Sequence, residues 1–245
     1  MRIRILISLL LVALGLYLFA YHGRIISEKA GEIFMPSKPK NGLVGEKITY
    51  QVKLGRINLG KAVFRRLPDA TLNERPVSLV TFETKLARFR DFEKIYSDPE
   101  NFLPVKVERS VTTWPFPETI TEDYDQKNFV LTINKTARGR STQKVFKKNG
   151  PINNALLLPY YVRNATDLDK SFSLKVLLPI QEFTIQLAEK TEVEVPAGKF
   201  MAYRFKSTPD KFEIWISADE RRIPLKIRGS SGLGYVLVME QYSRD

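Results

Sequence analysis

A two-residue alternation of apolar and polar side chains constrains this chain more than any other feature of its sequence. In residues 47–54, KITYQVKL, apolar side chains occupy every second position, between lysine, threonine and glutamine. Successive side chains of a β-strand point to opposite faces, so this pattern predicts a strand with one buried face. Similar segments recur along the chain, and turn residues separate them. About a dozen such strands predict an all-β fold, either an antiparallel open barrel or a strongly curved sheet.

One segment, residues 151–163, breaks the alternation. Ile152, Leu156, Pro159, Tyr160 and Arg163 lie at helical spacing within it. The segment therefore predicts one short, bent helix, in which Pro159 either kinks the helix or starts a second turn. We expect this helix to cover the open side of the sheet.

The N-terminus predicts a hydrophobic helix that enters a membrane. Residues 5–21 carry no charge and follow a basic lead of Arg2 and Arg4. A charge at the centre of a bilayer costs about 2.5–3.5 kcal/mol, so such a run indicates a membrane segment. The segment is either a retained signal anchor or a cleaved signal peptide. We favour the anchor, because the run is longer than the apolar region of about 7–15 residues in a signal peptide.

Both alternatives export the rest of the chain. We expect a periplasmic protein, either tethered to the inner membrane or released after cleavage. Residues 1–22 form the membrane segment, and residues 23–44, which include the aperiodic stretch SKPKNG, form a tether. Residues 45–245 form the exported β domain.

The domain lacks cysteine and histidine, on which many catalytic and zinc sites depend. The chain has no cysteine, and its one histidine, His22, lies beside the membrane segment. This excludes disulfides, Cys/His zinc sites, thiol nucleophiles and a Ser-His-Asp triad within the domain. The segment Gly55–Ala62 has the spacing of a phosphate-binding loop, but alanine stands where serine or threonine would hold magnesium. We expect no catalytic residues, no metal and no cofactor; a hydrolase that uses carboxylates alone stays open.

The chain is basic, with a formal charge of +12. On an exported domain this charge suggests lipid headgroups or envelope polysaccharide as partners, whereas nucleic acid has no support beyond charge. Each basic side chain near an anionic membrane adds about 1 kcal/mol of attraction, and the alternative is a solvated loop. The candidate anionic-surface residues form a run without an acid: Lys135, Arg138, Arg140, Lys144, Lys147 and Lys148.

Several spans, taken together, resemble the bacterial family called domain of unknown function 3108, whose members are exported envelope proteins. The resemblance implies export, an antiparallel β architecture and no catalytic residues to transfer. By analogy it also implies a likeness to open barrels that carry lipids or lipoproteins between membranes. The matching spans are residues 45–60, 154–163 (NALLLPYYVR), 195–202 (VPAGKFMA), 214–227 (IWISADERRIPLKI) and 232–240.

Two functional hypotheses follow. The first is a carrier or binding domain that holds an acyl chain or another apolar envelope ligand on the concave side of the sheet. Tyr160 and Tyr161 would line the mouth, Arg163 and Arg222 would bind an anionic headgroup, and Trp215 would line the second face of its strand. The alternative role for these five residues is core packing and solvated turns.

The second hypothesis is a structural or assembly module that docks another envelope protein through a sheet edge or the basic loop. Pro224, inside an expected strand, suggests an edge position where a partner strand can add.

Overall fold

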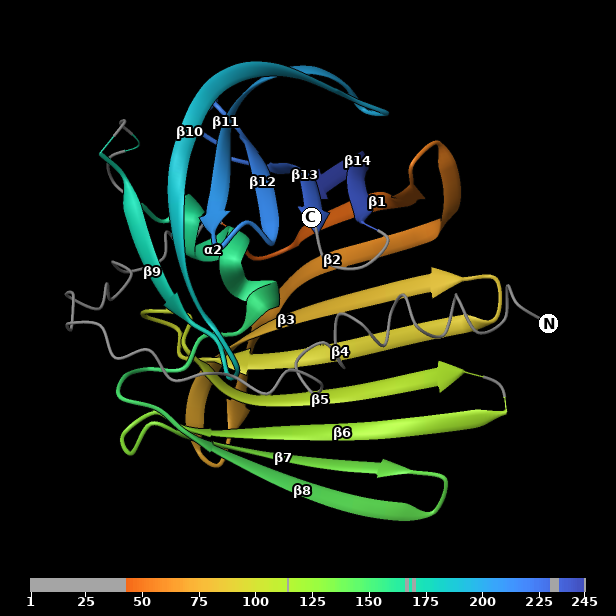
Figure 1. Cartoon of the computed structure of the whole chain (residues 1–245), viewed down its shortest axis with the longest axis vertical. Coiled ribbons are helices and arrows are strands. Elements are labelled where there is room, and N and C mark those ends of the chain that lie inside the picture. Colours follow the sequence, from red (N-terminus) through yellow and green to blue (C-terminus); the bar gives the residue numbers. More distant parts are fainter. Residues whose placement is uncertain (1–42, 114, 166–167, 169–170, 230–233, 245) are drawn as a thin grey trace.

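The computed structural model describes residues 43–113, 115–165, 168, 171–229 and 234–244 (Figure 1). The predicted membrane segment and nearly all of the predicted tether lie outside these residues. The helices within the described part lack the length and apolar character needed to cross a bilayer.

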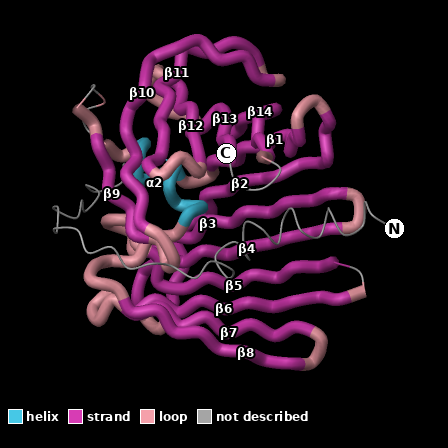
Figure 2. Tube along the Cα trace, in the orientation of Figure 1, coloured by secondary structure: helices cyan, strands magenta, loops and turns pink. Residues whose placement is uncertain are grey.

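Within the described residues, fourteen antiparallel strands form one sheet (Figures 1 and 2). Its order is β8-β7-β6-β5-β4-β3-β2-β1-β14-β13-β12-β11-β10-β9, so β8 and β9 are the two edges. The strands are β1 (Glu46–Leu54), β2 (Ile57–Leu72), β3 (Arg75–Leu86), β4 (Phe89–Ser97), β5 (Pro104–Thr113), β6 (Phe116–Asp125), β7 (Val130–Ala137), β8 (Arg140–Lys147), β9 (Ser173–Leu177), β10 (Glu182–Val195), β11 (Gly198–Thr208), β12 (Phe212–Ser217), β13 (Pro224–Gly229) and β14 (Tyr235–Arg244).

The first and last strands pair with each other, which places both in the interior of the sheet. Glu46 lies opposite Arg244 and Leu54 opposite Tyr235. The sheet then runs as one meander from β1 to β8 and another from β14 back to β9. Among the described strands β8 and β9 do not pair, so this sheet curls without closing. The all-β prediction is confirmed in the form of one curved, open antiparallel sheet.

The connection between the two edges contains the short helix. A 3₁₀ turn, η2 (Ala155–Leu157), leads into α2 (Leu158–Arg163). The Asn154 side chain accepts a hydrogen bond from the Leu156 N–H and so caps the turn. Pro159 occupies the first turn of α2, where a missing N–H costs nothing. Of the two alternatives for this proline, the structure has the start of a second turn.

The helix lies buried inside the curl. All six residues of α2 are buried, and Figure 1 shows the helix among the surrounding strands. The Tyr160 ring stacks on Phe102 with centroids 5.0 Å apart and meets Phe64 of β2 at 5.8 Å. The alternation in β1 places Ile48, Tyr50 and Val52 in the same core. The helix that the chain carries between the edges of the sheet therefore lies in the same core as the apolar faces of β1 and β2.

The edge position suggested by Pro224 is wrong. Proline is the first residue of β13, and β13 lies between β12 and β14. The first residue of a strand tolerates proline because no ladder donor is needed there.

Candidate functional site

The two tyrosines of α2 lie in the core and not at the mouth of a ligand cavity, which corrects the prediction. Tyr160 and Tyr161 are only 2% and 1% exposed. The Tyr161 hydroxyl donates to the backbone carbonyl of Phe102 at 3.1 Å. Burial raises the pKa of both phenols, so they stay neutral hydrogen-bond donors. The alternative of core packing holds for this pair.

Arg163 is occupied by a partner from its own chain. Its Nη1 and Nη2 donate to the two carboxylate oxygens of Glu46 at 2.6 and 2.7 Å. Nη2 also donates to the carbonyl of Arg221 at 3.0 Å. Both side chains of the pair are buried, which makes this a two-pronged ion pair shielded from water. The predicted role in binding an anionic headgroup is corrected: the guanidinium already holds a carboxylate.

Arg222 closes the C-terminal end of α2. Its Nη1 donates to the Arg163 carbonyl at 2.9 Å and to the carbonyl of Ala165. Carbonyls at the end of a helix lack partners within the helix, and a cation there satisfies them. Arg222 therefore fixes the helix to the β12–β13 turn, and its predicted availability to a headgroup is corrected in the same way.

Trp215 lies between two cations on a buried face of β12. The Arg204 guanidinium is 5.3 Å and the Lys226 ammonium 4.7 Å from the ring centroid. Glu213, two residues earlier on the same face, accepts from Arg204 at 2.8 Å and pairs with Arg228 at 2.9 Å. The ring is 6% exposed, so this cluster is packed and does not present the indole to a ligand.

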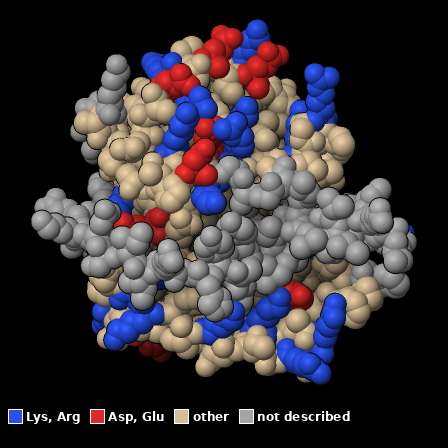
Figure 3. Space-filling view, in the orientation of Figure 1, with Lys and Arg blue, Asp and Glu red and all other residues tan. Residues whose placement is uncertain are grey.

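The predicted basic run is spread over both faces of the sheet edge. Lys135 is paired with Glu118 at 2.6 Å, and burial lowers the pKa of Lys148. The register places Lys144 opposite Ile133 and Lys147 opposite Val130, which puts these two lysines on opposite faces. Arg138 lies in the β7–β8 turn and Arg140 begins β8. In Figure 3, blue basic side chains predominate over red acidic ones in the lower part of the molecule.

Strand β8 offers an unpaired edge. Among the described strands it pairs with β7 alone, and seven of its eight residues are exposed. The Lys148 N–H donates to the Phe129 carbonyl at 2.9 Å. Hydrogen-bonded and non-hydrogen-bonded pairs alternate along an antiparallel ladder, so the backbone groups that point away from β7 can be assigned. They belong to Ser141, Gln143, Val145 and Lys147.

A charged group on β4–β6 was not predicted from the sequence. Arg109 donates through Nε and Nη2 to the Asp91 carboxylate at 2.9 and 2.5 Å, and its Nε lies 3.3 Å from Glu93. Burial raises the pKa of Glu93 to about 8; Arg109 opposes this shift, whereas Asp91 and Glu122 add to it. The apolar–polar alternation predicts the strand on which each residue lies. Only the register between β4 and β5 shows that Asp91 and Glu93 lie beside Arg109.

This charged group has no arrangement for metal chemistry. The described residues contain no cluster of three or more acidic or histidine side chains that could hold a metal ion. The Tyr124 hydroxyl donates to Glu122 at 2.5 Å, so that carboxylate too has a partner within the sheet.

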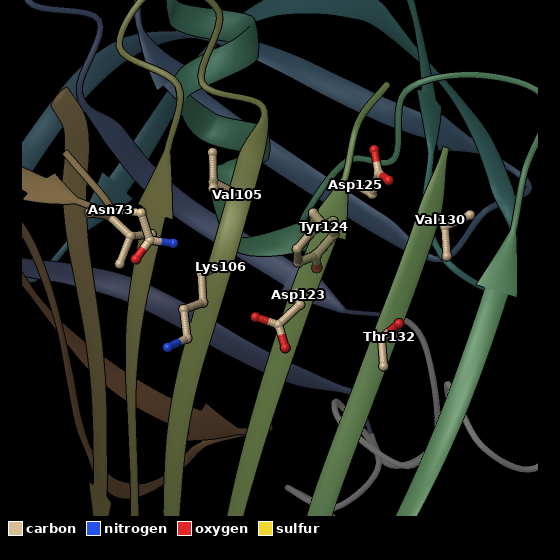
Figure 4. Close-up of a pocket in the computed structure, with 9 residues that line it drawn as sticks. Asn73, Val105, Lys106, Asp123, Tyr124, Asp125, Val130 and Thr132 are labelled. Atoms are coloured by element: carbon tan, nitrogen blue, oxygen red, sulfur yellow. The ribbon is translucent and has the colours of Figure 1, made fainter. Parts of the chain in front are cut away.

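A shallow pocket of about 400 Å³ lies on the sheet near the β2–β3 turn (Figure 4). Lys106, Asp123 and Thr132 follow one another across β5, β6 and β7, and Asn73 borders them. Lys106 pairs with Glu108 at 3.0 Å, and this hydrogen bond raises the lysine pKa. The amine therefore stays protonated and cannot act as a general base at neutral pH.

Among solved structures, the chain resembles a β-barrel-like protein of the domain of unknown function DUF1849 from Brucella abortus. The identity is 8%, the match covers 83% of this chain and 98% of that one, and the TM-score is 0.52. At this identity the likeness concerns the fold alone. The match supports a barrel-like architecture.

Two further structures overlap most of the chain. One is from Bacteroides fragilis and is described as exported, with a YmcC-like fold; its identity is 12%, its TM-score is 0.29, and the match covers 86% of this chain and 99% of that one. The other is described as a lipoprotein, from Parabacteroides distasonis, with 10% identity, a TM-score of 0.28 and coverage of 87% and 100%. These TM-scores are too low to carry an argument.

The curated proteins compared with the chain include no match. One family model, described as a protein of unknown function (DUF3108), matches residues 49–240. That range contains all of the spans that carried the resemblance except the first few residues of the earliest. The chain belongs to the DUF3108 family.

Proposed function

We propose that this chain is a non-enzymatic protein of the cell envelope that binds a partner protein by adding one of the partner's strands to β8. The observation that carries the proposal is the open edge itself. An exposed strand with unpaired backbone groups is the template that β-strand addition uses. Export is supported by the uncharged run of residues 5–21 behind two arginines.

The edge of β8 has the length and regularity that pairing requires. The strand runs for eight residues, and no proline or register shift interrupts its pairing with β7. Four residues direct their N–H and C=O groups outward, enough for an extended segment to form a short ladder. Val145, one of the four, is 60% exposed and gives a partner an apolar contact in the middle of the edge.

The positive charge of β8 determines which partner segments fit this edge. From Arg140 to Lys148 the strand and its end carry four basic residues and no acid. Lysine on an edge strand discourages indiscriminate pairing, and like charges placed opposite each other are destabilising. A second β8 from another copy is therefore disfavoured. An extended segment rich in Asp or Glu fits the edge.

The apolar-ligand hypothesis stays a prediction with less support. A carrier requires free apolar space within the curl, and α2 with its aromatic neighbours occupies part of that space as buried core. The pocket at Lys106 has a mixed lining, in which the charged Lys106, Asp123 and Asp125 stand beside Val105 and Val130, and these charges do not favour an acyl chain.

Peptide binding tests strand addition. The probe is a peptide in which Glu alternates with Val, and the control peptide carries N-methyl groups on alternate amides, which block ladder hydrogen bonds. We expect the full chain to bind the first peptide and not the second, measured by fluorescence anisotropy. Val145→Pro removes an outward N–H without touching a donor to β7, and it should abolish binding.

Val145→Thr is the matched control, because it keeps the N–H and suits a strand. It should bind like the unmodified chain. Equal binding of the two peptides, or binding by Val145→Pro as strong as by Val145→Thr, would overturn strand addition. Failure of the unmodified chain to bind the acidic peptide would also overturn it.

A further inference from the structure

Four turns lie together at one end of the sheet. They connect β1 to β2, β3 to β4, β5 to β6 and β7 to β8, and the meander brings all of them to the right-hand side of Figure 1. Neighbouring strands are about 4.8 Å apart, so these turns follow a line of about 35 Å. They form a continuous rim, although more than 80 residues separate the first turn from the last.

This rim is basic and contains no acid in its turns. The turn sequences are GRIN, LARF, TWPF and ARGR. The turns and strand ends at the opposite end of the same strands contain the acids Glu74, Asp98, Glu100 and Asp125 beside the bases Arg75, Lys127, Lys147 and Lys148. The two ends of the meander therefore differ in that acids accompany the bases at one end and are missing from the turns of the other. We call the first end the arginine rim, defined by Arg56, Arg88, Arg138 and Arg140.

The four arginines are exposed. None of them forms an ion pair with a described residue, whereas Arg109 and Arg163 both do. An exposed guanidinium with no internal carboxylate retains its hydrogen-bond donors for an external anion.

Apolar side chains stand among these arginines. Ile57 is 63% exposed and Phe116 is 45% exposed, two of the four large apolar residues that the described surface leaves exposed. The Arg138 guanidinium lies 4.0 Å from the centroid of the Phe116 ring. Arginine paired with an exposed aromatic ring suits the boundary between water and lipid, where one end of the pair is polar and the other apolar.

We propose that the arginine rim rests on the surface of a membrane that contains anionic lipid. Phosphate headgroups would accept hydrogen bonds from the four guanidinium groups, while Ile57 and Phe116 would enter the boundary region. A soluble polyanion would satisfy the charges and leave the apolar side chains in water, so the lipid surface fits both features. The proposal shares the envelope location with the proposed function and does not depend on strand addition at β8.

The chain between the membrane segment and the sheet is long enough for this orientation. The sheet begins at Glu46, and β1 reaches the rim at its other end, about 30 Å away. Residues 23–44, at about 3.3 Å per extended residue, can span about 70 Å. A membrane segment at residues 5–21 and a rim in contact with the same membrane are therefore compatible.

Single-cysteine labelling of the full chain tests the contact, because the chain has no cysteine of its own. Ala87→Cys places an environment-sensitive fluorophore in a rim turn, and Glu100→Cys places it at the opposite end of β4. Each protein is reconstituted into vesicles of phosphatidylcholine alone or with about one third phosphatidylglycerol. We expect a headgroup-attached quencher to reach residue 87 in the anionic vesicles and residue 100 in neither.

Charge variants separate the rim from overall charge. A variant with Arg56, Arg88, Arg138 and Arg140 changed to Gln should lose quenching at residue 87 about tenfold. The matched control changes four other exposed basic residues to Gln: Arg65, Lys94, Lys127 and Lys206. It removes the same charge and should keep the quenching. Equal loss in both variants, or equal quenching at residues 87 and 100, would overturn the proposal.

A soluble polyanion distinguishes the remaining alternative. Heparin at a charge concentration equal to that of the vesicles would displace the rim if charge alone held it. We expect the quenching at residue 87 to persist, because Ile57 and Phe116 bind only the lipid surface. Complete displacement would overturn the lipid assignment. Binding of the acidic peptide to β8 is measured separately, so failure of either proposal can be recognised without the other.

Discussion

The ion pair between Arg163 and Glu46 gives this arginine a structural role in place of the ligand-binding role that the sequence suggested. In the sequence, an arginine after a tyrosine pair suggests a headgroup site. In the structure its guanidinium joins α2 to β1 through two short hydrogen bonds, out of contact with water. A charge in such a place needs its partner, because desolvation of an unpaired ion is costly.

Removal of one partner should therefore be severe. Glu46→Gln leaves the Arg163 charge buried without a counter-ion, and we expect the free energy of unfolding to fall by about 3–5 kcal/mol. Urea denaturation followed by circular dichroism measures it. The double variant Glu46→Leu, Arg163→Met should recover most of the loss. For comparison, Lys61→Gln breaks an exposed pair with Glu240 and should cost less than about 1 kcal/mol. A Glu46→Gln loss as small as that of Lys61→Gln would contradict this account.

Glu93 should make the stability depend on pH. Burial raises its pKa from 4.5 to about 8, so between these values the folded chain holds a proton that the unfolded chain has released. The free energy of unfolding then falls as the pH rises through this window, and the contribution is complete below it. Glu93→Gln should reduce the slope of Tm against pH, whereas Glu100→Gln, on an exposed turn, should leave it unchanged. Equal slopes in the two variants would show that Glu93 titrates normally.

At the scale of single elements, alternation and turn chemistry predict the strands well. Residues 47–54 lie in β1 as expected, and a short helix forms within residues 151–163, as the 3₁₀ turn η2 followed by α2 with Pro159 in its first turn. The sequence alone does not predict which strands pair with each other. Nothing in the order of residues shows that β1 meets β14, or that Asp91 comes to Arg109, because strand register depends on contacts between distant segments.

The position of α2 also depends on contacts between distant segments of the chain. Its spacing predicts a helix, but the direction in which its tyrosines point depends on the aromatic residues that other strands supply, such as Phe64 and Phe102. A six-residue helix without a polar face is stable here because all of its residues are buried.

Substitution of Tyr161 tests whether α2 is a core element. Tyr161→Phe loses one hydrogen bond and leaves the Phe102 carbonyl without its donor, which should cost about 1 kcal/mol. Tyr161→Ala leaves a cavity and should cost about 3–5 kcal/mol. Guanidinium unfolding measures both. A residue at an open mouth would tolerate either change, so a Tyr161→Ala cost under about 1 kcal/mol would restore the ligand-lining role.

For the whole molecule, the decisive property is that the sheet formed by the described residues is open, with β8 and β9 as its edges. Two meanders share the β1–β14 pair, and the chain between their free edges folds inward as α2. Outside this core, the described part of the molecule offers two surfaces to its surroundings: the edge of β8 and the arginine rim. These surfaces follow from topology. The sequence therefore predicted the basic run from Lys135 to Lys148, but it did not show that Arg56 and Arg88 join Arg138 and Arg140 in one line of turns.

Amide hydrogen exchange on β8 tests the central claim most directly. In the chain alone, the N–H groups of Thr142, Lys144 and Phe146 donate to β7 and should exchange slowly, while those of Gln143 and Val145 face water and should exchange fast. Addition of the acidic peptide should slow Gln143 and Val145 and leave the other three unchanged. Peptide binding with fast exchange persisting at Gln143 and Val145 would show that the partner does not add a strand to β8.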